Sequence, residues 1–277
     1  MNAPKHGHDA SRLSELFERL MGTLRNFIRE NRITHDEYRR AVAFLSEVGA
    51  ERETPLLCDV FLEVTVDEVE NRDRPGTATT IEGPYYVPDA PELRSPCALP
   101  HRPDEPGPIL SFSGTVRSTD GAPLPGAVLD LWQPDSQGRY SHVNIPEADA
   151  PYNLRGRVVV DGDGRFEVET RLPGSYEIPK SGPTGVLLTA LGRHAWRPAH
   201  LHMKVNAPGH RSITTQLFLK DDPRIDSDVV VGAVKPSLVV EAVRRDGPAD
   251  ARGKGGGAER CTLTYDFVLE PARARAA

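Results

Sequence analysis

The sequence predicts a mainly β protein that carries an α-helical layer at its N-terminal end. Apolar residues recur at helical spacing over roughly the first 70 residues. Farther along, short apolar and β-branched runs alternate with turn signals, and the chain's 25 prolines and 24 glycines suit many short connections. A series of short strands of this kind is typical of a β-sandwich. We therefore expect a disordered tail over residues 1–10, a helical region over 11–75 and a β-sandwich over 76–277.

Three amphipathic helices are expected in the helical region. The first follows an apolar stripe over residues 13–28, and the second begins at Thr34, where Glu37 completes a capping box. Gly49 is expected to end the second helix, and a third follows Pro55. Stripes of this kind serve first as core packing. A small helical layer also needs a further surface to bury a second face, so we expect a homodimer through these helices.

Residues 81–108 are rich in proline and are expected to form an ordered loop. Structureless loops of this length inside a compact domain are usually functional. The β segments expected after it are 110–116, 128–132, 157–160, 166–168, 201–205, 213–219 and 261–269. The glycine-rich stretch 252–257 is expected to be a mobile hairpin tip, because it lacks the Gly-x4-Gly-Lys-Ser/Thr pattern of a phosphate loop.

Composition excludes several classes of function. The formal net charge is −6 and no basic run stands out, so we expect no nucleic-acid partner. No run of about 18 apolar residues occurs, so we expect no membrane insertion. The polar N-terminus lacks the apolar core of a secretion signal. Cys58, Cys97 and Cys261 are scattered and odd in number, so neither a disulfide framework nor a zinc site is expected, and the cytoplasm is the expected compartment.

The pair His200 and His202 gives the first sign of a functional site. In a strand, side chains two residues apart point to the same face, so both imidazoles are expected to face one way. They would supply half of a metal site, although two histidines near a strand start are more often ordinary core-edge or surface residues. The first acid after His202 is Asp221, in an expected loop, so a two-histidine, one-carboxylate iron(II) site lacks its carboxylate.

Tyr140 and Tyr176 are the remaining candidates for ligands. Tyr140 follows a strand and a turn, and Tyr176 lies in an expected loop flanked by proline and glycine. A tyrosinate is a hard anionic oxygen donor and suits a hard cation such as Fe(III). Each tyrosine taken singly is more often a packing residue whose hydroxyl finds one partner, so the residues alone leave the site open.

Five segments resemble those of the intradiol ring-cleavage dioxygenases: Thr80–Val87 (TIEGPYYV), Asp130–Gln133 (DLWQ), Gly138–Ser141 (GRYS), Gly182–Gly185 (GPTG) and Gly192–His202 (GRHAWRPAHLH). The chain looks most like the catechol, chlorocatechol and hydroxyquinol 1,2-dioxygenases, over roughly residues 11–270. Tyr140 and Tyr176 are 36 residues apart, and Tyr176 and His200 are 24 apart, which fits that family. The resemblance thus joins the two tyrosines and the two histidines into one expected site.

The resemblance implies Fe(III) held by Tyr140, Tyr176, His200 and His202. A catechol and O2 are the implied substrates, and a cis,cis-muconate is the product. Tyr176 is implied to leave the metal when a catechol binds and to accept one of its protons. Arg197 is implied to stabilise negative charge that develops on the ring. Gln216 is implied to lie near the metal, whereas its polar neighbours would also suit a solvent-facing strand.

Substrate-pocket positions carried over from the family are Leu56, Asp59, Ile81, Gly83, Pro84, Tyr85, Ile178, Pro179, Arg197, Val229 and Val230. Asp59 is an acid on an otherwise apolar helix. It is either a helix-surface carboxylate or a pocket group that accepts a hydrogen bond from an extra ring hydroxyl. Val229 and Val230 form a small apolar wall that would admit a substituted ring. We therefore expect cleavage of catechol or chlorocatechols, with a hydroxyquinol 1,2-dioxygenase that yields maleylacetate as the alternative.

Two other functional hypotheses compete with that of an intradiol dioxygenase. A transthyretin-like binding module would use the same β-sandwich with histidines that are merely structural. An extradiol or cupin-type Fe(II) dioxygenase would need a carboxylate ligand.

The family resemblance also implies that the N-terminal helices form a homodimer and hold a phospholipid between them.

Overall fold

The computed structural model describes residues 10–146, 150–245 and 259–272. The chain forms two compact units that divide between Glu51 and Arg52. Most of the tail expected over residues 1–10, and the hairpin tip expected over 252–257, lie outside the described residues. Ala10 itself begins the first helix. Among the described residues, no helix is long and apolar enough to cross a membrane.

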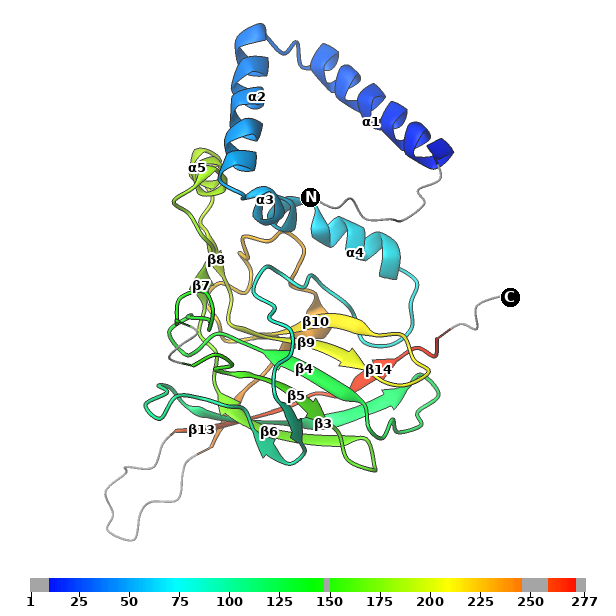
Figure 1. Ribbon diagram of the computed structural model, residues 1–277, viewed down its shortest axis with the longest axis vertical. Helices are drawn as coiled ribbons and strands as arrows, with labels where there is room; N and C mark the ends of the chain where they lie inside the picture. Colours follow the sequence, from blue (N-terminus) through cyan, green and yellow to red (C-terminus); the bar gives the residue numbers. More distant parts are fainter. Residues whose placement is uncertain (1–9, 147–149, 246–258, 273–277) are drawn as a thin grey trace. The chain divides into compact units, whose positions relative to one another are not determined.

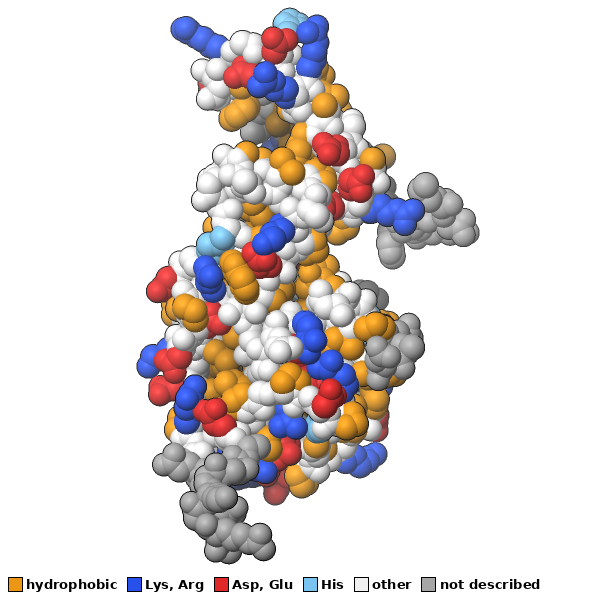
Figure 2. Space-filling model, turned by 90° about the vertical axis from the view of Figure 1, so that its left-hand side faces the viewer, with side chains coloured by type: hydrophobic (Ala, Val, Ile, Leu, Met, Phe, Trp, Pro, Cys, Tyr) orange, Lys and Arg blue, Asp and Glu red, His pale blue; other side chains and the backbone are white. Residues whose placement is uncertain are grey.

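The N-terminal unit contains helices α1 (Ala10–Glu30) and α2 (His35–Ala50). The capping box expected at the start of α2 is confirmed: the Thr34 hydroxyl accepts from the Glu37 backbone N–H, and Glu37 accepts from the Thr34 N–H at 2.8 Å. Gly49 does not end α2, which continues to Ala50. Apolar side chains are exposed between charged ones on these helices (Figure 2).

The expected third helix is two helices, α3 (Thr54–Phe61) and α4 (Glu63–Asn71). Leu62 leaves the helical conformation with φ −128° and ψ −35°. The buried residues Leu56, Val60 and Val64 keep a spacing of four across the break, so the apolar periodicity could not reveal it.

Two six-stranded sheets build the second unit (Figure 1). The first has the order β1-β5-β4-β9-β10-β11, and the second has the order β12-β13-β3-β6-β2 with β14 also on β3. One hydrophobic core draws on both sheets and on α3, which confirms the β-sandwich. The strands of the first sheet are β1 (Glu92–Arg94), β4 (Val128–Trp132), β5 (Arg155–Val159), β9 (His200–Asn206), β10 (Ile213–Leu219) and β11 (Val239–Val240). Those of the second are β2 (Cys97–Ala98), β3 (Ile109–Ser118), β6 (Arg165–Arg171), β12 (Val243–Arg245), β13 (Arg260–Thr264) and β14 (Phe267–Leu269).

Two expectations about the strands need correction. The segment 81–108 is not wholly loop, because β1 and β2 lie in it and pair with β5 and β6. The expected strand 261–269 is divided into β13 and β14, both parallel to β3. Residues 265 and 266 between them anchor the crossing: the Tyr265 N–H donates to the Ser113 carbonyl at 3.0 Å, and Asp266 accepts from the Thr115 N–H at 2.8 Å.

The helix α5 (Pro183–Ala190) links α3 to the sandwich. Glu53, just before α3, accepts from the Thr184 N–H near the first turn of α5 at 2.8 Å. A side chain at Gly182 would collide with the same carboxylate, 1.9 Å from its Oε1. This contact fixes the entry of α3, which carries Leu56 and Asp59. A two-stranded sheet, β7 (Tyr176–Glu177) with β8 (Trp196–Arg197), and the short 3-10 helix η1 (Pro236–Leu238) complete the fold.

Candidate metal centre

Strand β9 sets the candidate site, because it lies between β4 and β10 in the first sheet. Its residue His202 is paired with Trp132 on one side and with Gln216 on the other. The side chains of directly paired residues share a face of the sheet. His200 and His202 are confirmed to face the same way: both are fully buried and their Nε2 atoms lie 2.9 Å apart.

Tyr140 reaches the histidines from a tight turn after β4. Asp135 organises this turn, since it accepts from the backbone N–H groups of Gln137 and Arg139 at 2.9 and 3.0 Å. Gly138 in the turn has φ +79°, and a Cβ there would stand 2.5 Å from the Ser175 carbonyl oxygen. Only glycine therefore lets the Tyr140 turn approach the Tyr176 segment this closely.

Tyr176 does not lie in a loop, as the sequence suggested, but begins strand β7. Its partner across the ladder is Arg197 on β8. The pairing brings the Tyr176 ring to 5.5 Å from the His200 ring and 5.2 Å from the Tyr140 ring, centroid to centroid. The four side chains expected at the site are thus gathered at one buried place.

The hydrogen bonds around these side chains leave metal-binding atoms free. His200 Nδ1 lies 2.6 Å from the Pro198 carbonyl oxygen, which places the proton on Nδ1 and a lone pair on Nε2. The buried Tyr140 hydroxyl has no hydrogen-bond partner among the described residues. The 2.9 Å between the two Nε2 atoms suits two imidazoles bound at right angles to one ion, about 3 Å for bonds of about 2.1 Å. The residues therefore fit a metal ion.

Burial keeps all four groups neutral without a metal. It lowers the pKa of His200 and of His202 well below the usual range, and the Arg197 charge and, for His202, its neighbour His200 add to the effect. Burial also raises the pKa of both tyrosines, although the Arg197 charge opposes the rise. A bound cation would therefore displace protons from the phenols and find neutral imidazoles ready.

Arg197 is buried beside this cluster, not exposed on the surface. Its Nε and Nη2 donate to the two oxygens of Asp228 at 3.1 and 2.9 Å. Nη2 also donates to the Gln216 Oε1 at 2.9 Å, and Gln216 in turn donates to the Ile81 carbonyl at 2.8 Å. Burial is the largest single influence and would lower the pKa of the guanidinium, but the charge of Asp228, the Tyr176 phenol and the hydrogen bonds to both together raise it. Gln216 is therefore a buried part of the site, and the solvent-facing alternative is wrong.

The segment 81–85 borders the histidines. A Cβ at Gly83, where φ is +72°, would meet His202 Cε1 at 3.6 Å. The Tyr85 ring lies 4.8 Å from the Tyr140 ring and 5.8 Å from the Tyr176 ring. The remaining expected pocket positions divide by burial: Leu56, Ile81, Ile178, Val229 and Val230 are buried in the core, whereas Pro84 and Pro179 are exposed.

Three further residues lie at the candidate site, although no local sequence pattern indicates a role for them there. Trp132 stacks on His202 with ring centroids 4.8 Å apart and an interplanar angle of 13°. Arg155 is buried, donates to the Ser141 hydroxyl and the Tyr85 carbonyl at 2.6 and 2.7 Å, and lies over the Tyr140 ring. Asp228 holds Arg197. No local pattern marks Arg155 or Asp228, because each acts through a partner 14 or more residues away.

Asp59 is half-buried on α3 and shares a hydrogen bond with Glu63 at the start of α4. Burial raises the pKa of Asp59, while the Arg197 charge opposes the rise, which places Asp59 within electrostatic range of the site. Burial, followed by the Asp59 charge, raises the pKa of Glu63 to about 7. Both carboxyl groups therefore hold their protons to a higher pH than in water.

No group of three His, Cys, Asp or Glu side chains that could hold a metal ion occurs in the described part of the chain. A carboxylate-based iron(II) site therefore has no support here.

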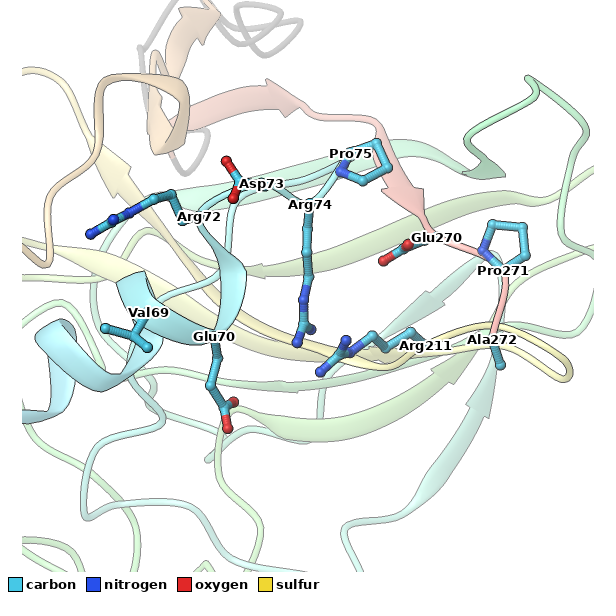
Figure 3. Close-up of a pocket in the computed structure, with 10 residues that line it drawn as sticks. All are labelled: Val69, Glu70, Arg72, Asp73, Arg74, Pro75, Arg211, Glu270, Pro271 and Ala272. Carbon is cyan, nitrogen blue, oxygen red and sulfur yellow. The ribbon is translucent and has the colours of Figure 1, made fainter. Parts of the chain in front are cut away.

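A separate pocket of about 510 Å³ lies between the end of α4 and the C-terminal segment (Figure 3). Arg74 and Arg211 point into it, but none of the expected site residues lines it.

Both parts of the chain match known protein families. Residues 10–78 match the family described as catechol dioxygenase N terminus, and residues 81–271 match the family described as dioxygenase. The chain is 43% identical over 238 residues to a chlorocatechol 1,2-dioxygenase of Rhodococcus opacus, which covers 85% of this chain and 92% of that protein.

Solved structures of the same kind are similar throughout. The crystal structure of 3-chlorocatechol 1,2-dioxygenase from Rhodococcus opacus has a TM-score of 0.85 at 37% identity, covering 95% of this chain and 100% of that one. Hydroxyquinol 1,2-dioxygenase from Pseudomonas putida has a TM-score of 0.84 at 35% identity, covering 96% and 94%.

We expect Glu63 to make stability depend on pH. Its pKa is raised from 4.5 to about 7 in the fold, so the folded state holds a proton that the unfolded state releases. The stabilisation is complete below the unfolded pKa and is lost as pH rises through about 7. Melting temperatures measured between pH 5 and 8 should therefore fall with pH in the wild type and fall less in Glu63→Gln. Glu68→Gln, exposed on the same helix, should follow the wild type, and identical curves for all three proteins would contradict the assignment.

Proposed function

This chain belongs to the family of intradiol ring-cleavage dioxygenases, and from that premise we propose that it uses Fe(III) and O2 to cleave a catechol between its two hydroxyl-bearing carbons, giving a cis,cis-muconate. The observation that carries this proposal is the convergence of two buried phenols and two neutral imidazoles beside a buried guanidinium. A transthyretin-like binding module would have no use for this set of donors.

In this proposal Tyr140, Tyr176, His200 and His202 hold the iron. Two phenolates offset much of a trivalent charge and favour the ferric state. Neutral imidazoles leave part of the positive charge of the iron uncompensated, so that a doubly deprotonated catechol can bind. When bound there, Fe(III) supplies a Lewis acid that draws electron density from the catechol ring and so makes a ring carbon reactive toward O2.

The protein's own side chains take different parts in the reaction. Tyr176 is the proposed base: as a phenolate that gives way to the substrate, it accepts a catechol proton at its hydroxyl oxygen. The Arg197 charge beside it limits the rise in the Tyr176 pKa. Arg197 also stabilises negative charge that develops on the ring, and it does so strongly because its guanidinium is buried. Tyr140 stays in place, since it is packed against Tyr85 and beneath Arg155.

The proposed substrates are catechol and substituted catechols, including chlorocatechols. The buried Val229 and Val230 offer an apolar wall, and such walls discriminate single substituents by only about 1–3 kcal/mol. Hydroxyquinol is the second candidate. The half-buried Asp59 and Glu63 favour it, because their carboxyl groups could bind an additional ring hydroxyl.

The proposed partner of α1 is a second copy of the chain. The helix buries no residue within its own chain, and its apolar stripe is exposed: Leu13, Leu16, Phe17, Leu20, Leu24, Phe27 and Ile28 are each between 41% and 63% exposed. A stripe of this size needs an apolar cover. We propose that the helices of two chains provide it, with a phospholipid between them.

We expect the two tyrosines to separate iron binding from turnover. Tyr140→Phe, like His202→Ala, should lose iron and with it the red colour of tyrosinate-to-Fe(III) charge transfer, because a fixed ligand is gone. Tyr176→Phe should retain part of the iron and lose turnover by at least about 100-fold, since the base is absent. Iron per chain, visible absorption and muconate formation provide the measurements.

Tyr265→Phe is the matched control for these variants, because its half-buried hydroxyl donates to the Ser237 carbonyl in another part of the fold. It should keep wild-type iron and activity. A wild-type protein that stays colourless, iron-free and inactive after loading with ferric iron would overturn the proposed function.

We expect steady-state kcat/KM values for catechol, 4-chlorocatechol and 3-methylcatechol to lie within about 200-fold of one another, because an apolar wall discriminates weakly. Hydroxyquinol should be the poorer substrate, and Asp59→Asn should reduce its turnover while leaving that of catechol within about threefold. If hydroxyquinol were cleaved far faster than the other three, the enzyme would be a hydroxyquinol 1,2-dioxygenase that forms maleylacetate.

We expect light scattering to give twice the mass of one chain. Leu20→Glu, which places a charge within the exposed stripe of α1, should produce monomers. Arg19→Glu, on the polar side of the same helix, should remain dimeric. Mass spectrometry of a solvent extract checks for the phospholipid, and a monomeric wild type would reject the proposed interface.

A further inference from the structure

We propose that Asp228 is a positioning residue that aims Arg197 at the reacting ring and ties this guanidinium to the apolar wall of the substrate pocket. The inference rests on the proposed function, because it concerns the group that stabilises charge on the substrate. Asp228 lies in the segment between β10 and η1, 31 residues after Arg197. Its side chain is 4% exposed, and that of Arg197 is 3% exposed.

The hydrogen bonds of Arg197 show what Asp228 does. A guanidinium has five N–H groups in a planar fork. Nε–H donates to Asp228 Oδ1, and the two hydrogens of Nη2 go to Asp228 Oδ2 and Gln216 Oε1. Only Nη1 is left, and it lies 3.5 Å from His200 Nε2. Asp228 therefore fixes the plane of the guanidinium and leaves one nitrogen facing the metal centre.

The burial of Arg197 gives Asp228 a second task. A guanidinium taken out of water is costly unless a carboxylate pairs with it in good geometry. The bidentate contact with Asp228 provides that pair, and Gln216 satisfies the remaining hydrogen of Nη2. Without Asp228, the guanidinium would keep only single hydrogen bonds to Gln216 and Tyr176, which fix its plane less firmly than a bidentate pair.

Asp228 also holds the wall that follows it in the chain. Its Oδ1 accepts from the Val230 backbone N–H at 3.0 Å. Val229 donates its N–H to the Trp196 carbonyl at 3.0 Å, next to Arg197 on β8, and its own carbonyl accepts from Arg193 Nη2 at 2.7 Å. The Asp228 carboxylate thus links the orientation of the Arg197 guanidinium to the position of Val229 and Val230.

The same contacts exclude a role for Asp228 as a general base. Oδ1 accepts two hydrogen bonds, Oδ2 accepts one from Nη2, and the side chain is 4% exposed, so both oxygens are engaged in these contacts. Asp228 acts through Arg197 and through the wall, and it does not touch the reacting atoms.

The test is Asp228→Asn in the full-length, iron-loaded enzyme, with catechol as substrate. An amide keeps the shape but presents an N–H group to one N–H of Arg197, so the bidentate contact is lost. We expect kcat for catechol to fall about 10- to 100-fold with KM within about threefold, while iron content and visible absorption stay as in the wild type. For 4-chlorocatechol we expect KM to rise as well. The substitution also weakens the contact from the Val230 N–H to residue 228, and Val229 and Val230 form the apolar wall proposed to face the ring substituent.

Asp67→Asn is the matched control. Asp67 forms an ion pair of 2.7 Å with Lys235, which belongs to the same stretch of chain between β10 and β11 but does not contact Arg197. It should leave kcat within about threefold of the wild type. An equal loss of kcat in Asp67→Asn and Asp228→Asn would mean that any damage to this segment slows the enzyme, and it would overturn the proposal.

A double substitution separates positioning from simple stability. Arg197→Ala leaves the Asp228 charge buried and unpaired, so adding Asp228→Asn should raise the melting temperature of that variant. It should not lower kcat further, because Asp228 has nothing left to position. A further loss of kcat in the double variant, or wild-type kcat in Asp228→Asn, would overturn the inference. Failure of the proposed function would instead appear in the wild type itself, as absence of iron and of catechol cleavage.

Discussion

The site depends on the place of strand β9 between β4 and β10. This pairing sets Trp132, His202 and Gln216 in one row across three strands and puts His200 two residues farther along the same face. The sheet thereby fixes both imidazoles on a rigid element, with Trp132 stacked on one of them. The tyrosines come from less regular segments, so they need their own anchors: Asp135 and Gly138 for the Tyr140 turn, and the ladder with Arg197 for Tyr176.

The second constraint is the cost of burying charge. The candidate site buries two guanidinium groups, those of Arg155 and Arg197, beside phenols and imidazoles that burial keeps neutral. The Arg197 charge is balanced by the carboxylate of Asp228. The same balance suits the proposed chemistry, because binding of a trivalent cation is offset by the loss of two phenolic protons. Farther out, burial raises the pKa of Asp59 and Glu63, which are the acids proposed to meet a substituent on the ring.

Local sequence patterns predict the large elements and most of the candidate site, and the predictions that are wrong have physical causes. The capping box at Thr34 and the strands that became β4 and β10 lie where local patterns put them. The break at Leu62 was missed because the buried residues keep helical spacing across it. A strand of two residues carries no periodicity, so the sequence pattern predicts a loop at Tyr176 where the structure has β7. Trp132, Arg155 and Asp228 were not assigned to the site, since a residue that supports another through space leaves no mark in its own neighbourhood.

By itself the sequence determined the kinds of chemistry available to this protein: alternation in β9 put two imidazoles on one face, and tyrosines with an arginine at family-like spacings supplied the rest. That information is local, because the type of a residue and the periodicity of its neighbours determine structure only over a few positions of the chain. The tertiary structure decided which of these groups meet and in what state of charge. The separations of 60 residues between Tyr140 and His200 and of 31 between Arg197 and Asp228 are closed only by packing. Burial then keeps the phenols and imidazoles neutral, and the Asp228 carboxylate helps to keep the Arg197 guanidinium charged, since the cost of a charge depends on its surroundings and not on its place in the chain.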